Sequence, residues 1–252
     1  AGCGLTQPTD IVANPLLRAL ALNGGELRTH ALQIGSPAID AGTAAGCPAT
    51  DARKFARPVD GNIPLDGVAT CDIGAFEFRP PTIVLAPASI DFGSVTIGLT
   101  SRLTVTATNA GDGDLIFAPV HTADLAPPFS FAADLCSGAT LTLAQSCAIT
   151  VQFAPTATVA STGAFHIPTN DPTKPLHESL VYPVSGTGVA GPVPNISVTD
   201  SIAPNSDLLA AFGDVTVGST ATIETITITN TGNANLVIGT IGGLNPIAAP
   251  FS

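Results

Sequence analysis

The sequence contains few charged residues and very few basic ones. Only 11% of its 252 residues are charged, the lysines are Lys54 and Lys174, and the net charge is −11. A protein that binds nucleic acid or an anionic membrane surface needs a basic stripe to neutralise phosphates. We therefore expect neither as a partner.

Other absences further limit the kind of protein that this sequence can encode. Methionine is missing even at position 1, so we expect Ala1 not to be the translation start and the chain to be a piece of something longer. No run of about 18 apolar residues is present to span a bilayer. With one Tyr and no Trp, the chain offers little material for an aromatic platform that would bind glycans.

The sequence does contain an internal repeat. Three segments of the first copy return in the second: 90–98 as 210–218, Asn109-Ala110-Gly111 as Asn230-Thr231-Gly232, and Pro128-Phe129-Ser130 as Pro250-Phe251-Ser252. Self-similarity at a fixed spacing is typical of arrays of modules. The first copy continues to Gly186-Thr187-Gly188, so we expect the second to be incomplete. Further residues of the polypeptide, or strands of a neighbouring subunit, would complete it.

Four of the five cysteines form two local pairs. Cys136 and Cys147 are eleven residues apart, and Cys47 and Cys71 flank a loop rich in Pro, Asp and Gly. No C-x-x-C spacing exists and the four histidines are scattered, which disfavours zinc. We predict the disulfides Cys47–Cys71 and Cys136–Cys147, formed in an oxidising compartment, and a partner for Cys3 upstream of Ala1. No metal or other cofactor is expected.

Three regions follow from the pattern of apolar residues. In 1–80, short apolar groups are broken by Gly or Pro, which indicates short strands and loops, with one helical turn at 15–22 capped by Asn14. Arg79-Pro80-Pro81 predicts a stiff linker. In 81–188 apolar residues alternate with Thr and other polar residues, as in 103–107 and 149–153, which predicts a β-sandwich. Residues 189–252 begin the same pattern again, with Ile226 and Ile228, and would form the first half of a second sandwich.

The first region resembles a known family through ordered motifs. These are Cys3-Gly4-Leu5-Thr6, Asn14-Pro15-Leu16-Leu17, Asn23-Gly24-Gly25, Thr29-His30-Ala31-Leu32, the segment 35–42 (GSPAIDAG) and the segment 71–77 (CDIGAFE). They are similar to the closing portion of a "choice-of-anchor Q" domain. The resemblance implies the last coils and C-terminal cap of a right-handed parallel β-helix of pectate-lyase-like shape, found in exported bacterial surface proteins.

The rest of the chain resembles a second family. Its motifs are Ile90-Asp91-Phe92-Gly93, Asn109-Ala110-Gly111, Cys136-Ser137-Gly138, Cys147, Val151-Gln152-Phe153-Ala154-Pro155, Asn170-Asp171-Pro172 and Gly186-Thr187-Gly188. They are similar to the Hydin-type, major-sperm-protein-like immunoglobulin-related modules of "choice-of-anchor D" proteins. Such modules are generally non-enzymatic, and a fold by itself does not fix a function.

A group of acidic residues in the first region is the main candidate for chemistry. It consists of Asp51, Asp60, Asp66, Asp72 and Glu77, with Arg53, Lys54 and Arg57 close in sequence. Pectate-lyase-like enzymes use acidic residues with calcium, but these lie in the predicted cap. We therefore predict a solvated, salt-bridged loop and no catalytic residues.

Two smaller features have structural explanations. Asp112 and Asp114, around Gly113, supply too few oxygens for calcium and indicate a turn. His30 lies in a segment expected to pack, and we predict a hydrogen-bonded structural imidazole. Asn195-Ile196-Ser197 matches a glycosylation sequon. No Ser or Cys stands in a nucleophile motif near a histidine.

These features predict an all-β protein without enzymatic activity. We expect an extracellular structural or adhesive protein, a modular stalk or filament component at the bacterial cell surface. Its expected partners are other copies of itself or other surface proteins, joined by strand addition, with glycans as a further candidate. The alternative is the non-catalytic tail of a carbohydrate-active β-helix enzyme whose catalytic coils lie upstream.

Overall fold

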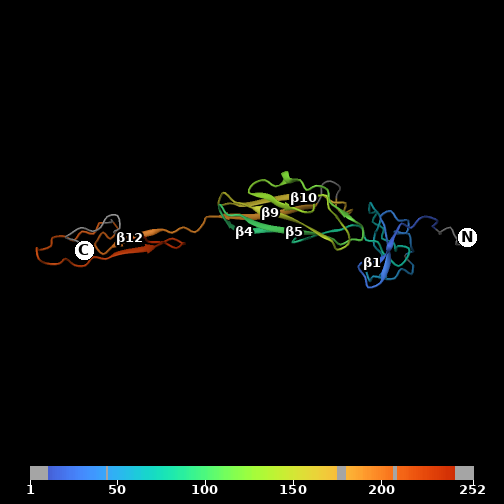
Figure 1. The fold of residues 1–252 in the computed structure, drawn as a ribbon, viewed down its shortest axis with the longest axis horizontal. Helices are drawn as coiled ribbons and strands as arrows, with labels where there is room; N and C mark the ends of the chain where they lie inside the picture. Colours follow the sequence, from blue (N-terminus) through green and yellow to red (C-terminus); the bar gives the residue numbers. More distant parts are fainter. Residues whose placement is uncertain (1–10, 44, 175–179, 207–208, 242–252) are drawn as a thin grey trace. The chain divides into compact units, whose positions relative to one another are not determined.

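The fold was analysed in a computed structural model, which describes residues 11–43, 45–174, 180–206 and 209–241. Cys3, His177 and the second Pro-Phe-Ser lie outside the described residues. The chain divides into two compact units, Ala1–Val189 and Ala190–Ser252. Within the described residues, regular structure consists of β-strands and one short 3-10 turn, η1 (Thr122–Asp124) (Figure 1).

The N-terminal region, residues 11–80, contains one antiparallel strand pair, β1 (Leu17–Leu22) with β2 (Arg28–Leu32). Its described residues include no parallel pair, so the coils of a parallel β-helix are not observed there. The predicted helical turn at 15–22 is wrong, because pairing with β2 draws this segment into a strand. Asn14 nevertheless caps a turn, since its Oδ1 accepts a hydrogen bond from the Leu16 N–H at 3.0 Å.

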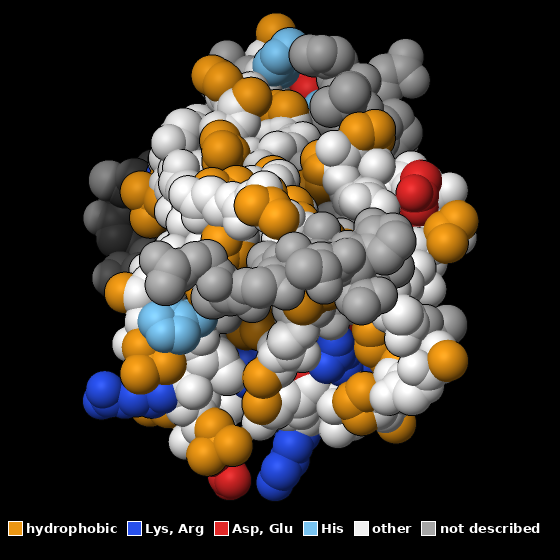
Figure 2. Space-filling model, turned by 90° about the vertical axis from the view of Figure 1, so that its right-hand side faces the viewer, with side chains coloured by type: hydrophobic (Ala, Val, Ile, Leu, Met, Phe, Trp, Pro, Cys, Tyr) orange, Lys and Arg blue, Asp and Glu red, His pale blue; other side chains and the backbone are white. Residues whose placement is uncertain are grey.

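All six residues of β1 are exposed, and three of them are leucines. Leu17, Leu20 and Leu22 are 44%, 52% and 63% exposed. Figure 2 shows one face of the molecule, on which apolar side chains are scattered and several Lys, Arg, Asp and Glu side chains also reach the surface. β1 therefore presents apolar side chains at the surface.

The central part of the chain is the predicted β-sandwich. One sheet has the strand order β3–β5–β9–β7 and the other has the order β10–β11–β4. Their bounds are β3 (Ile83–Ala86), β4 (Ile90–Thr96), β5 (Ser101–Asn109), β7 (Phe129–Asp134), β9 (Ser146–Phe153), β10 (Ala160–Ile167) and β11 (Leu180–Val189). A further short pair is formed by β6 (Leu115–Ile116) and β8 (Thr140–Leu141), which precede β7 and β9 in the sequence. Neighbouring strands are antiparallel except β11 and β4, which are parallel.

Alternation along the strands forms the core. Val105 and Ala107 of β5 and Ile149, Val151 and Phe153 of β9 are at most 1% exposed, while the threonines between them face outward. Phe153 stacks on Phe129 with ring centroids 4.9 Å apart. Period-two alternation with one buried face is what two packed sheets require.

The segment Arg79-Pro80-Pro81 is packed, so the prediction of a linker is wrong. The carbonyl of Arg79 accepts hydrogen bonds from the N–H groups of Asp112 (2.8 Å) and Gly113 (3.2 Å). Pro80 and Pro81 are buried, and Gly111 has no room for a Cβ because the Pro80 carbonyl lies against it. A turn of the sandwich thus fixes the segment, and residues on both sides of it belong to one compact unit.

In the second unit, β12 (Ile196–Asp200) pairs antiparallel with β13 (Ile226–Asn230). The register matches that of β3 and β5, because Ile196 faces Asn230 as Ile83 faces Asn109. The described residues therefore include the opening strand pair of a second module.

Candidate functional site

A buried guanidinium lies where the N-terminal region meets the sandwich. The side chain of Arg53 is 0% exposed, and all five of its N–H donors have acceptors. Nε donates to Asp51 (2.8 Å), one terminal nitrogen to the Asn23 carbonyl (3.0 Å) and Asp112 (2.7 Å), and the other to the Glu77 carbonyl (2.7 Å) and Asp112 (3.2 Å). Such a fully satisfied buried cation holds its neighbours in one geometry.

Asp112 is the acceptor that the sandwich contributes. Its side chain is 3% exposed and receives two hydrogen bonds from Arg53. Three more come from Arg79, through the backbone N–H (3.1 Å), Nε (3.1 Å) and a terminal nitrogen (3.0 Å). One carboxylate therefore joins two guanidinium groups, and the sequence separation between Arg53 and Asp112 is 59 residues.

Two phenylalanines cover these cations. The Arg53 guanidinium carbon lies 3.6 Å from the centroid of the Phe76 ring and 4.7 Å from that of Phe55. The corresponding carbon of Arg79 lies 3.7 Å from the centroid of Phe55. An aromatic face stabilises a desolvated cation electrostatically. We call Arg53, Arg79, Asp51, Asp112, Phe55 and Phe76 the junction cluster.

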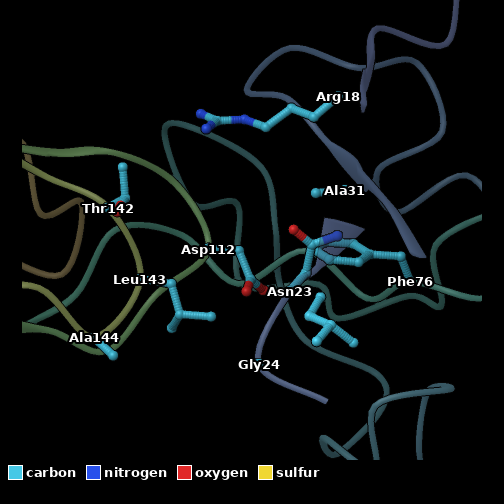
Figure 3. Close-up of a pocket in the computed structure, with 10 residues that line it drawn as sticks. Arg18, Asn23, Gly24, Ala31, Phe76, Asp112, Thr142, Leu143 and Ala144 are labelled. Atoms are coloured by element: carbon cyan, nitrogen blue, oxygen red, sulfur yellow. The ribbon is translucent and has the colours of Figure 1, made fainter. Parts of the chain in front are cut away.

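A hollow of about 270 Å³ opens beside the junction cluster. Figure 3 shows Arg18, Asn23 and Phe76 of the N-terminal region on one side of it and Asp112 and Leu143 of the sandwich on the other. Leu143 reaches close to the backbone of Gly24, where a Cβ would lie 2.9 Å from its methyl group. At the rim, Arg18 pairs with Asp114 at 3.0 Å. Residues of both the N-terminal region and the sandwich thus line the hollow.

Three of the five acidic residues of the N-terminal region are buried, so the prediction of a solvated loop is wrong for them, although the predicted salt bridges form; Asp60 is half-buried and Asp66 is exposed. Asp51, Asp72 and Glu77 are at most 5% exposed. Glu77 pairs with Arg57 at 2.7 Å and also accepts the N–H groups of Val59 and Asp72. The cause is a shortage of regular structure: in a region with two strands, carboxylates supply the acceptors that loop N–H groups need.

The pKa values of two of these buried carboxyl groups are shifted in opposite directions. Desolvation raises the pKa of Asp72 to about 7, and the nearby charges of Glu77 and Asp40 act in the same direction. Desolvation also acts to raise the pKa of Asp51, but hydrogen bonds from the Glu77 N–H and the charge of Arg53 outweigh it and hold the pKa below 3.8. The Arg53 charge beside Asp51 explains part of the difference.

The remaining acidic candidates also bind the chain itself. Asp60 accepts the Gly67 N–H at 2.8 Å, and Asp66 accepts the Val68 N–H at 2.9 Å. In the part of the chain that the structure describes, no group of three or more His, Cys, Asp or Glu residues is placed to hold a metal ion. Asp112 and Asp114 lie in the predicted turn, but each binds an arginine of the N-terminal region, which the sequence did not indicate.

Both predicted cysteine pairs are bonded in the structure. Cys47–Cys71 closes a separation of 24 residues within the N-terminal region, and Cys136–Cys147 closes one of 11 residues between β7 and β9. Cys71 and Cys136 are buried, at 4% and 0% exposure. Each of the two parts of the first unit therefore has one covalent link of its own.

The histidines and the sequon take part in local contacts. His30 Nδ1 lies 2.8 Å from the Arg18 carbonyl across β1 and β2, as a structural imidazole would, but its side chain is exposed. His166 pairs with Asp124 of η1 at 2.9 Å on the sandwich. Asn195 donates from Nδ2 to Thr231 Oγ1 at 3.0 Å.

The junction cluster is suited to holding two regions together and not to chemistry on a substrate. Every N–H of Arg53 and both oxygens of Asp112 are occupied by the chain itself. A general base or oxyanion donor must have hydrogen-bonding capacity left for the reacting group. Sequence reasoning missed Arg53, Phe55 and Asp112 as a set, because only the folded chain brings them together.

Comparison with known proteins finds a family match for the middle of the chain. Residues 81–182 match the model of the HYDIN/CFA65/VesB-like Ig-like domain family. No curated protein matches the chain. In the described residues, no helix is long and apolar enough to cross a membrane.

Solved structures similar to the chain come from different organisms. The VesB protease of Vibrio cholerae is 16% identical with a TM-score of 0.35, over 43% of this chain and 32% of VesB. A Porphyromonas gingivalis W83 protein of unknown function is 17% identical with a TM-score of 0.36, over 47% and 53%. The PapD-like domain 7 of human CEP192 is 15% identical with a TM-score of 0.34, over 50% and 98%. The chain thus spans a third to a half of the first two proteins. On the family match, residues 81–182 are similar to the Ig-like domains of the HYDIN/CFA65/VesB-like family.

Proposed function

We propose that the protein is a non-enzymatic structural component at a bacterial cell surface, in which modules are joined to hold a partner or to build a filament or stalk. The Hydin-type Ig-like domain and the internal repeat support a modular structural role. The two disulfides support an oxidising location outside the cytoplasm. Adhesion to another surface protein or a glycan is part of the same proposal.

The junction cluster is the observation that carries this proposal. In an enzyme, buried charged groups retain capacity for a substrate, whereas here Arg53 and Asp112 bind only each other and their own chain. Their position makes the N-terminal region and the sandwich one unit. A spacer that must keep its length benefits from such a joint in place of a mobile linker.

The proposal also includes a β-helix to which the N-terminal region belongs. The exposed β1, with three exposed leucines, is suited to lie against further strands. We include in the proposal that residues 1–80 form the closing coils and cap of such a helix. Secretion and anchoring at the cell surface are likewise part of the proposal.

Labelling of intact source cells tests the proposal. Antibodies raised against the purified chain should bind intact cells, and external protease should remove the signal while a cytoplasmic marker stays protected. A signal that appears only after lysis would refute surface location.

Enzyme assays test the non-enzymatic part of the proposal. The chain should release no product from polygalacturonate or other acidic polysaccharides. Turnover that is lost in the Asp72→Asn variant, and retained in a variant of the exposed Lys54, would refute the non-enzymatic role.

A further inference from the structure

Each of the two modules binds the chain segment that enters it through the backbone of one turn. In the first copy, the Arg79 carbonyl accepts the N–H groups of Asp112 (2.8 Å) and Gly113 (3.2 Å), and the Arg79 N–H donates to the Asp112 carboxylate at 3.1 Å. These three hydrogen bonds use no side-chain atom of Arg79. They can therefore form with any entering residue except proline, which lacks the N–H.

The second copy has the same three hydrogen bonds. The Val193 carbonyl accepts the N–H groups of Asn233 (3.0 Å) and Ala234 (3.3 Å), and the Val193 N–H donates to Asn233 Oδ1 at 2.8 Å. The two entering segments differ in length, since two prolines follow Arg79 and one follows Val193. The turn thus binds the same backbone groups of the entering residue in both copies, although the segments are not of equal length.

The side chains that meet at this contact match in charge in each copy. The Arg79 guanidinium donates two further hydrogen bonds to the Asp112 carboxylate, at 3.0 and 3.1 Å, and lies over the Phe55 ring. At the same places the second copy has Val193 and Asn233, both uncharged, and residues 190–252 contain no Lys or Arg. An entering arginine is thus combined with aspartate, and an entering valine with asparagine.

The aspartate in the first turn binds more than one cation. Its carboxylate is 3% exposed, and each of its oxygens accepts a hydrogen bond from Arg53 as well as from Arg79. A buried carboxylate that loses its cationic partners is strongly destabilising. The same aspartate would therefore act against a preceding region that lacks guanidinium groups, which is one way in which interfaces exclude a wrong partner.

We propose that this turn is the docking position for the region that precedes a module, and that the residue at Asp112, or at Asn233 in the second copy, determines which region is accepted. Aspartate selects a preceding region that ends in arginine and supplies a second, buried guanidinium. Asparagine accepts a region that ends in an uncharged residue. The inference rests on the proposed structural role and names the chemistry by which one module recognises the region before it.

A double-mutant cycle in the full chain tests the first copy. The variants are Arg79→Val, Asp112→Asn and both together, and the readout is the hydrogen-exchange protection of the Gly113 amide. Arg79→Val should lower this protection about tenfold in the wild-type background and about twofold or less in the Asp112→Asn background, because the ion pair is then already lost. The matched control is Arg102→Val, at an exposed arginine of β5 that binds Gln152, and it should leave this amide unchanged.

Transfer of the charged pair to the second copy tests the same inference by a gain. Val193→Arg and Asn233→Asp together should raise the protection of the Ala234 amide about twofold to fivefold, and about 1 M salt should remove the gain, because an exposed ion pair is weak and screened. Neither change alone should produce it. Both positions are exposed, so this test holds even if Arg79→Val prevents the first unit from folding.

Three results would overturn the inference. Additive losses for Arg79→Val and Asp112→Asn would mean that the two side chains do not act as a pair. A gain from Asn233→Asp alone that equals the gain of the double variant would make aspartate a better turn residue for any entering segment. No gain from the double variant would show that the turn does not distinguish charge. Cell labelling and enzyme assays are independent of all three, so either proposal can fail while the other stands.

Discussion

The two copies of the module have the same turn and differ in what surrounds it. In the first copy Asn109 Oδ1 accepts the N–H groups of Gly111 (2.9 Å) and Thr82 (3.3 Å). In the second, Asn230 Oδ1 accepts those of Gly232 (3.0 Å) and Asn195 (3.3 Å). The same turn and the same strand register are therefore present in both copies.

The two copies differ at the next turn residue whose side chain accepts a backbone N–H, which is Asp112 in the first copy and Asn233 in the second. Asp112 accepts the Arg79 N–H at 3.1 Å, and Asn233 accepts the Val193 N–H at 2.8 Å. Only the aspartate carries a charge, and it also holds two guanidinium groups in a buried site. The shared backbone pattern fixes the fold of the turn, and the side-chain charge decides what the turn can bind.

Loss of that charge should produce the largest effect. Asp112→Ala leaves Arg53 buried without one of its two carboxylate partners, and we expect the first unit to lose about 3–5 kcal/mol of its free energy of unfolding. Asn233→Ala, at an exposed position, should lose about 0.5–1 kcal/mol from the second unit. Urea denaturation with hydrogen exchange read separately in the two units measures both.

The variant Asp112→Asn removes the charge of this side chain and keeps its shape. It retains one acceptor oxygen, as Asn233 does, and should give a loss between those of the two alanine variants. Equal losses for Asp112→Ala and Asn233→Ala would mean that the junction cluster adds nothing to stability.

Removal of the sandwich disulfide should have the next largest effect. The double variant Cys136→Ala, Cys147→Ala should destabilise the first unit by about 3 kcal/mol on the chain-entropy estimate. Hydrogen exchange in the second unit should not change. Alkylation of the unreduced, unfolded wild-type protein, followed by mass spectrometry, provides the control, and modified Cys136 or Cys147 would contradict the pairing.

Truncation of matched core positions should have a smaller effect. Ile83→Ala should destabilise the first unit by about 2 kcal/mol, the low end for a buried isoleucine, because β3 is an edge strand. Ile196→Ala, at 53% exposure, should change the second unit by about 0.5 kcal/mol or less. Similar losses would show that the second strand pair is covered in solution.

The last prediction concerns pH. Burial raises the pKa of Asp72 to about 7 from 3.8, so the folded first unit binds this proton more tightly than the unfolded chain does. Its contribution to stability is fully present below about pH 4 and is lost as the pH rises through 7. The melting temperature of the first unit should therefore fall between pH 5 and pH 8. The fall should be smaller in Asp72→Asn, and an identical slope would assign it to another group.

Much of the sandwich could be predicted from sequence, because its signals are local. Alternation in 103–107 and 149–153 gave β5 and β9, and Asn-x-Gly gave the turn. The pairs Cys47–Cys71 and Cys136–Cys147 followed from short spacing.

The N-terminal region was predicted less well, because its order depends on distant partners. Asp51 accepts the N–H of Glu77, which is 26 residues away, and no periodicity marks such a bond. The β-helix implied by the resemblance is not observed in the described residues. From sequence alone Arg53 is expected to lie in a solvated loop, since charged residues are rarely fully buried unless they are paired.

The turn that contains Asp112 in the first copy and Asn233 in the second also has a consequence for how repeated modules diversify. Its backbone frame accepts either aspartate or asparagine at the position of Asp112 and Asn233, and a single base change converts one codon into the other. After duplication, a module can gain or lose a site for a cationic neighbour while its own fold is preserved. A single nucleotide change can then decide whether a module binds a cationic neighbour.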